Sequence, residues 1–240
     1  MSLVKRFKIN KTGRDLIVGD IHGHFTKLQA ALDAVGFNPG DGDRLFSVGD
    51  LVDRGPESHL SLEWLGRPWF HAVAGNHEDF AIRWPNGNMQ AGNYAANGGT
   101  WNIANSPDDR RMFADAFAAL PVAIELETLD GLVGIVHADC PAPSWQQFIG
   151  SLESPLTSKR ELEHLVDMAQ WSRGRVESTF DGGVDGVRAV VVGHTPMERW
   201  TSLGNVIFID MGAWCGREFC ILDAHTLRPS TKELLDWSTA

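Results

Sequence analysis

The chain has few cysteines, no long apolar run and a deficit of positive charge. Cys140, Cys215 and Cys220 make an odd number without the paired spacing of a zinc site, so we expect buried thiols rather than a disulfide framework. No segment approaches the roughly 18 apolar residues that a membrane helix needs. The basic start, residues 1–14, has no apolar signal core. We therefore expect a cytoplasmic protein without membrane contact.

Negative charge exceeds positive charge, with 31 acidic residues against 21 Lys and Arg and a formal net charge of −10. Such a field repels polyanions, which argues against nucleic acid or an anionic membrane as a partner. A phosphate group on a small molecule or peptide is not excluded, because bound cations reverse the field inside one cleft. The basic residues near the start are interpreted as a solvated edge; they are Lys5, Arg6, Lys8, Lys11 and Arg14.

The length of 240 residues and an apolar fraction of 43% fit one sizeable α/β domain. Short β-rich runs alternate with helical stretches, which predicts βαβ units and a mainly parallel sheet. The expected strands are 16–18, 45–48, 70–74, 122–127, 132–137, 190–192, 206–209 and 219–222. The expected helices lie near 26–35, 59–65 and 158–170, with another that begins near His77. We expect a single catalytic domain over residues 1–240, with a cap-like loop or helical segment around 85–120.

Polar loops follow the first three predicted strands. They read GDIHG (residues 19–23), GDLVDRGP (49–56) and GNHE (75–78), and two later strands end in His137 and His194. Because ligands bind beyond the carboxyl ends of strands in open α/β sheets, these loops are expected to converge. Singly, each residue has an ordinary structural role, such as capping a helix. Five strand ends with matching chemistry favour one functional site.

Three aspartates in these loops, Asp20, Asp50 and Asp53, would repel each other at neutral pH unless cations lay among them. Carboxylate, amide oxygen and imidazole ligands suit manganese, iron or zinc, and the lack of thiolates disfavours a structural zinc site. We predict two divalent metal ions, with Mn²⁺ as the first choice and Fe or Zn as alternatives. Asp50, at the middle strand end, is the natural bridging carboxylate.

The three loops resemble the GD-x-HG, GD-x-x-DRG and GNHE signatures of the metal-dependent serine/threonine phosphoprotein phosphatases. This family belongs to the calcineurin-like metallophosphoesterase superfamily, and the likeness is greatest to the group of the bacteriophage lambda phosphatase and its bacterial relatives. It extends, in the same order, to residues 97–101, 137–139, 171–173, 193–196 and 209–213. The resemblance implies a β-sandwich flanked by helices and built from βαβ units.

The resemblance also implies a role for individual residues. Two sets of metal ligands share one carboxylate: Asp20, His22 and Asp50 for one ion, and Asp50, Asn76, His137 and His194 for the other. Four further residues are implied to act on the substrate: His77 as general acid, Asp53 as the carboxylate that orients it, and Arg54 and Arg173 as the pair that grips the phosphoryl oxygens. Arginine suits phosphate because its planar fork matches two oxygens at once.

The implied reaction is hydrolysis of phosphoserine and phosphothreonine monoesters in a phosphoprotein or phosphopeptide, with phosphotyrosine as a further substrate. A metal-bridging hydroxide attacks phosphorus directly, so no covalent phospho-enzyme is needed. A serine alkoxide leaves only with a proton, which accounts for the general acid.

Three other functions are compatible with this scaffold. In symmetrical diadenosine tetraphosphate hydrolases the second motif typically has Ala where this chain has Asp53, and the third ends in Asp rather than Glu78; both differences favour the phosphatase. The Asp53–Gly55 run and the net acidity count against a phosphodiesterase or nuclease. A binding scaffold that has lost activity usually lacks a ligand, the acid or the phosphate clamp, and none is missing here.

Overall fold

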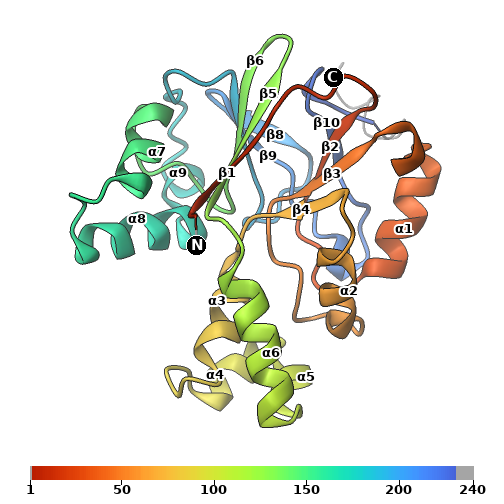
Figure 1. Ribbon diagram of the computed structural model, residues 1–240, viewed down its shortest axis with the longest axis vertical. Coiled ribbons are helices and arrows are strands. Elements are labelled where there is room, and N and C mark those ends of the chain that lie inside the picture. The colour runs from red at the N-terminus through yellow and green to blue at the C-terminus, as the bar shows by residue number, and fades with distance from the viewer. Residues whose placement is uncertain (1, 231–240) are drawn as a thin grey trace.

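Two β-sheets pack face to face between layers of helices in the computed structural model, which describes residues 2–230 (Figure 1). The six-stranded sheet has the order β1 (Val4–Phe7), β5 (Ala123–Thr128), β6 (Gly131–Ile135), β7 (Ala189–Val192), β9 (Val206–Phe208) and β8 (Thr201–Leu203). The five-stranded sheet has the order β11 (Arg228–Pro229), β10 (Ile221–Asp223), β2 (Asp15–Val18), β3 (Arg44–Ser47) and β4 (Phe70–Ala72). The predicted sandwich flanked by helices is confirmed.

Both sheets are mixed: among the described residues five strand pairs, that of β1 with β5 included, are parallel and four are antiparallel. The central strands β2, β3 and β4 run parallel to one another, and so do β6, β7 and β9. Antiparallel pairs join β5 to β6, β8 to β9, and β10 to both β2 and β11. A short connection suffices for an antiparallel pair, whereas parallel strands need a crossover. The βαβ prediction therefore holds for the strands whose ends carry the polar loops.

Helices cover the outer face of each sheet (Figure 1). Beside the five-stranded sheet lie α1 (Phe25–Ala34) and α2 (Ser61–Leu65), and beside the six-stranded sheet lie α7 (Trp145–Glu153), α8 (Lys159–Trp171) and α9 (Gly174–Glu177). Four helices project from the sandwich as a lobe: α3 (Asn76–Arg83), α4 (Ala91–Ala96), α5 (Thr100–Ile103) and α6 (Pro107–Ala118). We call residues 76–118 the helical lobe. The cap-like segment predicted around 85–120 thus consists largely of α4, α5 and α6.

Three apolar layers hold the sandwich together, and the alternation of strand side chains creates them. Ile17 and Phe46 point into the layer between the sheets, whereas their neighbours Leu16 and Leu45 pack against α1. On the other sheet Val191 joins the middle layer, while the residues on either side of it pack under α7. Strands buried on both faces cannot shift in register, so the loops at their ends are held in place.

Some elements are not among those predicted from the sequence: β1, β8, β11, α7 and the short helices in stretches expected to be loops. The basic run at the start is more than a solvated edge, because Val4–Phe7 pairs with β5 and Arg6 contacts Glu125 and Glu153. All three cysteines are free, as expected, but Cys215 is exposed rather than buried.

Among residues 2–230, none of the helices has the length and apolar character needed to cross a membrane. Because residues 231–240 lie outside the described part of the chain, one domain over all 240 residues stays a prediction.

An ion pair between a buried carboxylate and a partly exposed arginine joins the segment before β2 to the segment before β3. The carboxylate of Asp43 accepts hydrogen bonds from the backbone N–H and Nη2 of Arg14, both at 2.7 Å, and from the N–H of Asn38 at 3.0 Å. Burial opposes ionisation, but these donors outweigh it and hold the pKa of Asp43 below its ordinary value.

Asp43→Asn is expected to lower the free energy of unfolding at pH 7 by about 1–3 kcal/mol, because it removes the charge from a buried group that accepts several hydrogen bonds. Since the pKa of Asp43 is depressed in the folded state, its contribution is complete above pH about 5 and fades as the pH falls through that pKa. Urea unfolding at pH 7 and in acid measures the difference, with the exposed Asp167→Asn as control. A deficit that grows in acid would contradict this account.

Candidate active site

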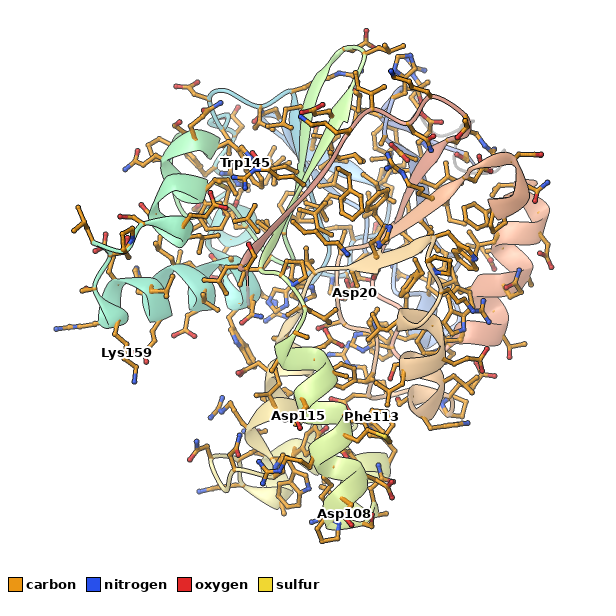
Figure 2. All side chains as sticks on the ribbon, viewed as in Figure 1. Asp20, Asp108, Phe113, Asp115, Trp145 and Lys159 are labelled. Carbon is orange, nitrogen blue, oxygen red and sulfur yellow. The ribbon has the colours of Figure 1, made fainter. Side chains whose placement is uncertain are left out.

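The loops that follow parallel strands of both sheets meet in one place. Asp20 follows β2, Asp50 follows β3 and Asn76 follows β4, while His137 and His194 follow β6 and β7 of the other sheet. Asp20 lies near the centre of the molecule, above the helical lobe (Figure 2). The site therefore sits at the junction of the two sheets, where the carboxyl ends of their central strands converge.

The backbone of the site is held in an uncommon conformation. Among residues 2–230, seven residues other than glycine have a positive φ, and five of them belong to the predicted site. These five are His22 (φ 46°), Asp50 (51°), Asp53 (70°), Arg54 (64°) and His194 (65°). Left-handed backbone in such residues costs energy and is typical of functional sites, where the surrounding structure imposes it.

Glycines at two strand ends leave room for the carboxylates. A Cβ added at Gly75 would collide with Oδ1 of Asp50, and one added at Gly193 would collide with Oδ1 of Asp20. These glycines therefore allow the chain to pass directly against the charged groups.

His22 offers a free imidazole nitrogen to one half of the site. The residue is fully buried, and its Nδ1 lies 3.0 Å from the carbonyl oxygen of Val52, which can only accept; Nδ1 therefore carries the proton. The remaining Nε2 is buried without a hydrogen-bond partner among the described residues. It lies 3.6 Å from Oδ2 of Asp50 and 3.8 Å from Oδ2 of Asp20. A buried lone pair that faces carboxylates fits a ligand for a cation.

Four possible ligand atoms face each other in the other half. His137 directs Nδ1 to the carbonyl of Val48 (2.7 Å), and His194 directs Nε2 to the carbonyl of Trp171 (3.2 Å). The other ring nitrogens, Nε2 of His137 and Nδ1 of His194, lie 2.9 and 2.8 Å from Oδ1 of Asn76. Oδ1 of Asp50 is 3.3 Å from Nε2 of His137. Nδ1 of His194 faces a carbonyl oxygen as a bare acceptor, and Nε2 of His137 lies against a carboxylate that favours a positive charge there, so the donor set fits a metal ion.

Charge in the site also calls for cations. Burial, together with the nearby carboxylates of Asp210 and Asp50, raises the pKa of Asp20 well above its ordinary value. Burial likewise opposes ionisation of Asp50, but the imidazoles of His137 and His77 hold its pKa well below that value. Burial and the neighbouring His137 lower the pKa of His194 to about 3, so its ring is neutral and has a lone pair to offer.

The ligand atoms form two groups that share Asp50. One comprises His22, Asp50 and His77, and the other Asp50, His137 and His194, with all ligand atoms of a group within 4.8 Å of one another. Asp20 is outside both groups and accepts hydrogen bonds from the N–H of His194 at 3.1 and 3.2 Å. The buried Asp and His side chains are thus consistent with a dinuclear metal site.

His77 lies at the edge of this centre, against Asp53 and Arg54. Its Nδ1 is 2.7 Å from Oδ2 of the fully buried Asp53, and its Nε2 is 3.2 Å from Nη2 of Arg54 and 3.8 Å from Oδ2 of Asp50. The guanidinium of Arg54 stacks on Trp214, with Cζ 4.4 Å from the ring centre. Arg54 and Arg173 are both exposed, and Nη2 of Arg173 donates to the carbonyl of His194 (3.3 Å).

Sequence reasoning assigns no role to several residues that shape the site. Glu78 accepts hydrogen bonds from the N–H groups of Asp50, Leu51 and Gly75 (2.8–2.9 Å), and so ties the loop after β3 to the loop after β4. Burial and the charge of Asp50 raise the pKa of Glu78 to about 7. Asp210 follows β9 and is buried beside Asp20. In the sequence, only the family resemblance at residues 209–213 points to Asp210.

The sandwich and its buried Asp and His cluster define a metallophosphoesterase, a hydrolase of phosphate esters. Residues 14–198 match the calcineurin-like phosphoesterase family, and the chain belongs to that family. The resemblance seen in the sequence is therefore confirmed.

Individual relatives include two kinds of hydrolase. The chain is 33% identical over 206 residues to serine/threonine-protein phosphatase 2 of Salmonella typhimurium. The matched region covers 83% of this chain and 87% of that protein. The chain is 34% identical over 210 residues to serine/threonine-protein phosphatase 1 of the same organism, covering 85% and 89%. It is 30% identical over 196 residues to a symmetrical bis(5'-nucleosyl)-tetraphosphatase of Neisseria meningitidis, covering 77% of this chain but 65% of that protein.

Solved structures share the fold. A crystal structure of a candidate diadenosine tetraphosphatase gives a TM-score of 0.64 at 21% identity and covers 95% of this chain and 96% of that one. A cold-active protein-tyrosine phosphatase from a psychrophilic Shewanella gives 0.60 at 19% identity and covers 93% and 78%. At these identities the likeness shows the fold alone.

Titration calorimetry of the metal-free chain is expected to detect two Mn²⁺ sites, because the donor atoms fall into two groups. His22→Ala is expected to keep one of them and His137→Ala to keep the other, since each imidazole belongs to a different group. The exposed His164→Ala is the control and is expected to keep both. Two intact sites in both His22→Ala and His137→Ala would contradict the assignment.

Proposed function

We propose that this chain is a metal-dependent phosphoprotein phosphatase that hydrolyses phosphoserine and phosphothreonine monoesters, with phosphotyrosine as a further substrate. In this proposal one ion is held by Asp20, His22 and Asp50, and the other by Asp50, Asn76, His137 and His194. Two divalent cations held there would activate water near neutral pH and would offset charge on the phosphoryl group.

His77 is assigned the role of general acid. Its ring is fixed by Asp53, which accepts a hydrogen bond from Nδ1. In the described structure Arg54 donates to Nε2 of His77. A phosphoryl group that accepts from Arg54 instead releases Nε2 to hold a proton and deliver it to the leaving alkoxide. The leaving oxygen of a serine or threonine ester needs this proton far more than that of an activated ester.

The two exposed arginines are assigned to the phosphoryl oxygens. Arg54 and Arg173 lie at the edge of a buried acidic and imidazole cluster, so their guanidinium groups meet solvent while the other site residues do not. Two guanidinium groups bound to one phosphate orient it and neutralise the charge that spreads over its oxygens during transfer.

The observation that carries the proposal is the position of Nε2 of His77. It lies 3.8 Å from the carboxylate that both ligand groups share and 3.2 Å from the guanidinium of Arg54. The imidazole proposed as acid and an arginine proposed to grip phosphate therefore lie beside the ligand cluster, as the proposal requires. The two Salmonella phosphatases, matched over 87% and 89% of their lengths, support the same proposal.

Dinucleotide tetraphosphate hydrolysis is the second candidate, and the similarity to the Neisseria tetraphosphatase favours it. That match covers 65% of the relative's length, less than for the two phosphatases. The two reactions differ in the leaving group. Cleavage of a phosphoanhydride expels a phosphate group, which is a stable anion and needs no proton. A general acid held by a buried carboxylate is therefore of more use to a monoester phosphatase.

Removal of metal with a chelator is expected to abolish hydrolysis of an aryl phosphate, and added Mn²⁺ is expected to restore it.

Under one Mn²⁺ concentration, kcat/KM for a phosphoserine peptide is expected to exceed that for diadenosine tetraphosphate by about tenfold or more, a difference of roughly 1.4 kcal/mol in the barrier. A phosphodiester such as bis(4-nitrophenyl) phosphate serves as the third substrate. Preference for the dinucleotide or the diester would replace the proposal with the corresponding alternative.

His77→Asn is expected to lower kcat on a phosphoserine peptide by about 10²–10⁴, because the alkoxide then leaves without a positioned acid. The loss on 4-nitrophenyl phosphate is expected to be much smaller, since nitrophenolate is a good leaving group. The matched control is His164→Asn, an exposed residue on α8. Equal losses on both substrates would remove His77 from this role.

A further inference from the structure

The carboxylate that orients His77 has two partners, and the second comes from the helical lobe. Oδ2 of Asp53 contacts Nδ1 of His77, whereas Oδ1 accepts a hydrogen bond of 2.7 Å from Nε1 of Trp101. Asp53 has no exposed surface, so both of its oxygens need a donor from the protein. Trp101 supplies one from a position 48 residues away in the chain.

An indole suits this task because it is a donor only and does not titrate. Its N–H fixes the plane of the carboxylate and favours the charged form without competing for the proton on His77. The direction of Oδ2, and with it the tilt of the imidazole ring, is thereby set from both sides of Asp53.

Trp101 is itself held by packing within the lobe. It lies in α5, and its ring meets that of Phe113 edge to face, with centroids 4.8 Å apart at an angle of 89°. Phe113 belongs to α6, a helix that Ser106 caps by accepting from the N–H of Asp109 (3.1 Å). Figure 2 shows Phe113 on α6, in the part of the lobe that lies below Asp20. The indole is therefore placed by a helix rather than by a free loop.

The contacts close into a ring. α6 packs against α3, which carries His77, so the support of Trp101 and the residue that it serves belong to one packed unit. The same lobe also meets Arg54, whose N–H donates to the carbonyl of Gly98 (3.4 Å). The helical lobe thus contacts both the residue proposed as acid, through Asp53, and the residue proposed to grip phosphate.

We propose that Trp101 is a positioning residue for His77 that acts through Asp53, and that the helical lobe exists in part to hold it. This inference rests on the proposed role of His77 as general acid. It assigns the lobe a place in catalysis that the resemblance to other phosphatases does not.

The test is Trp101→Phe, which keeps a ring against Phe113 and removes the N–H. Two aryl monoesters that differ in leaving group are compared: phenyl phosphate, which needs a proton, and 4-nitrophenyl phosphate, which scarcely does. We expect kcat to fall by about tenfold or more on the first and by less than about threefold on the second, with KM unchanged on both. Trp84→Phe is the matched control, because Trp84 also packs in the lobe but its Nε1 has no hydrogen-bond partner among the described residues.

A second readout does not depend on activity. In the metal-free protein, the proton between His77 and Asp53 is expected to give a downfield ¹H NMR signal that Trp101→Phe shifts or removes and Trp84→Phe leaves in place. Phe113→Leu keeps the indole but loosens its packing, and is expected to act in the same direction more weakly. If Trp101→Phe folds poorly, Phe113→Leu still tests the positioning role of Trp101.

An equal loss on both esters, or an unchanged downfield signal in Trp101→Phe, would overturn the positioning role. Failure of the proposed function would look different: the unaltered chain would leave a phosphoserine peptide intact, whatever Trp101→Phe does to the two esters.

Discussion

The structure depends on the electrostatic cost of gathering Asp50, Asp20 and Asp210 in a buried site. Each carboxylate raises the free energy of ionising the others, and burial removes the water that would screen them. Three imidazoles, each with one ring nitrogen bound to a backbone carbonyl, direct the other nitrogen into the same space. A cluster of this composition is consistent with a dinuclear metal site, in which cations replace the protons that would otherwise relieve the repulsion.

The two sheets bring the residues of this cluster together. Strands buried on both faces end at one edge, and the chain turns there through left-handed residues that few other contexts would tolerate. Glu78 spans two of these turns and accepts from three backbone N–H groups. The strain at the site is thus maintained by packing at a distance and by buried hydrogen bonds nearby.

Much of this could be predicted from the sequence, because the site residues follow buried strands in short motifs whose chemistry is local. β1 could not, since Lys5 and Arg6 hide its strand pattern and the acidic partners of Arg6 lie far along the chain. The residues of α7 do show helical spacing, with Trp145, Phe148, Ile149 and Leu152 buried on one face, so a periodicity count detects this helix. The contact between Trp101 and Asp53 has no local pattern and needs the folded chain.

The central claim is that two cations bind on either side of Asp50. Anomalous diffraction from crystals soaked in Mn²⁺, collected at the manganese edge, tests it most directly. The account predicts two peaks that share Asp50 as a neighbour, one beside His22 and the other beside Asn76, His137 and His194. A single peak, or peaks away from Asp50, would contradict it.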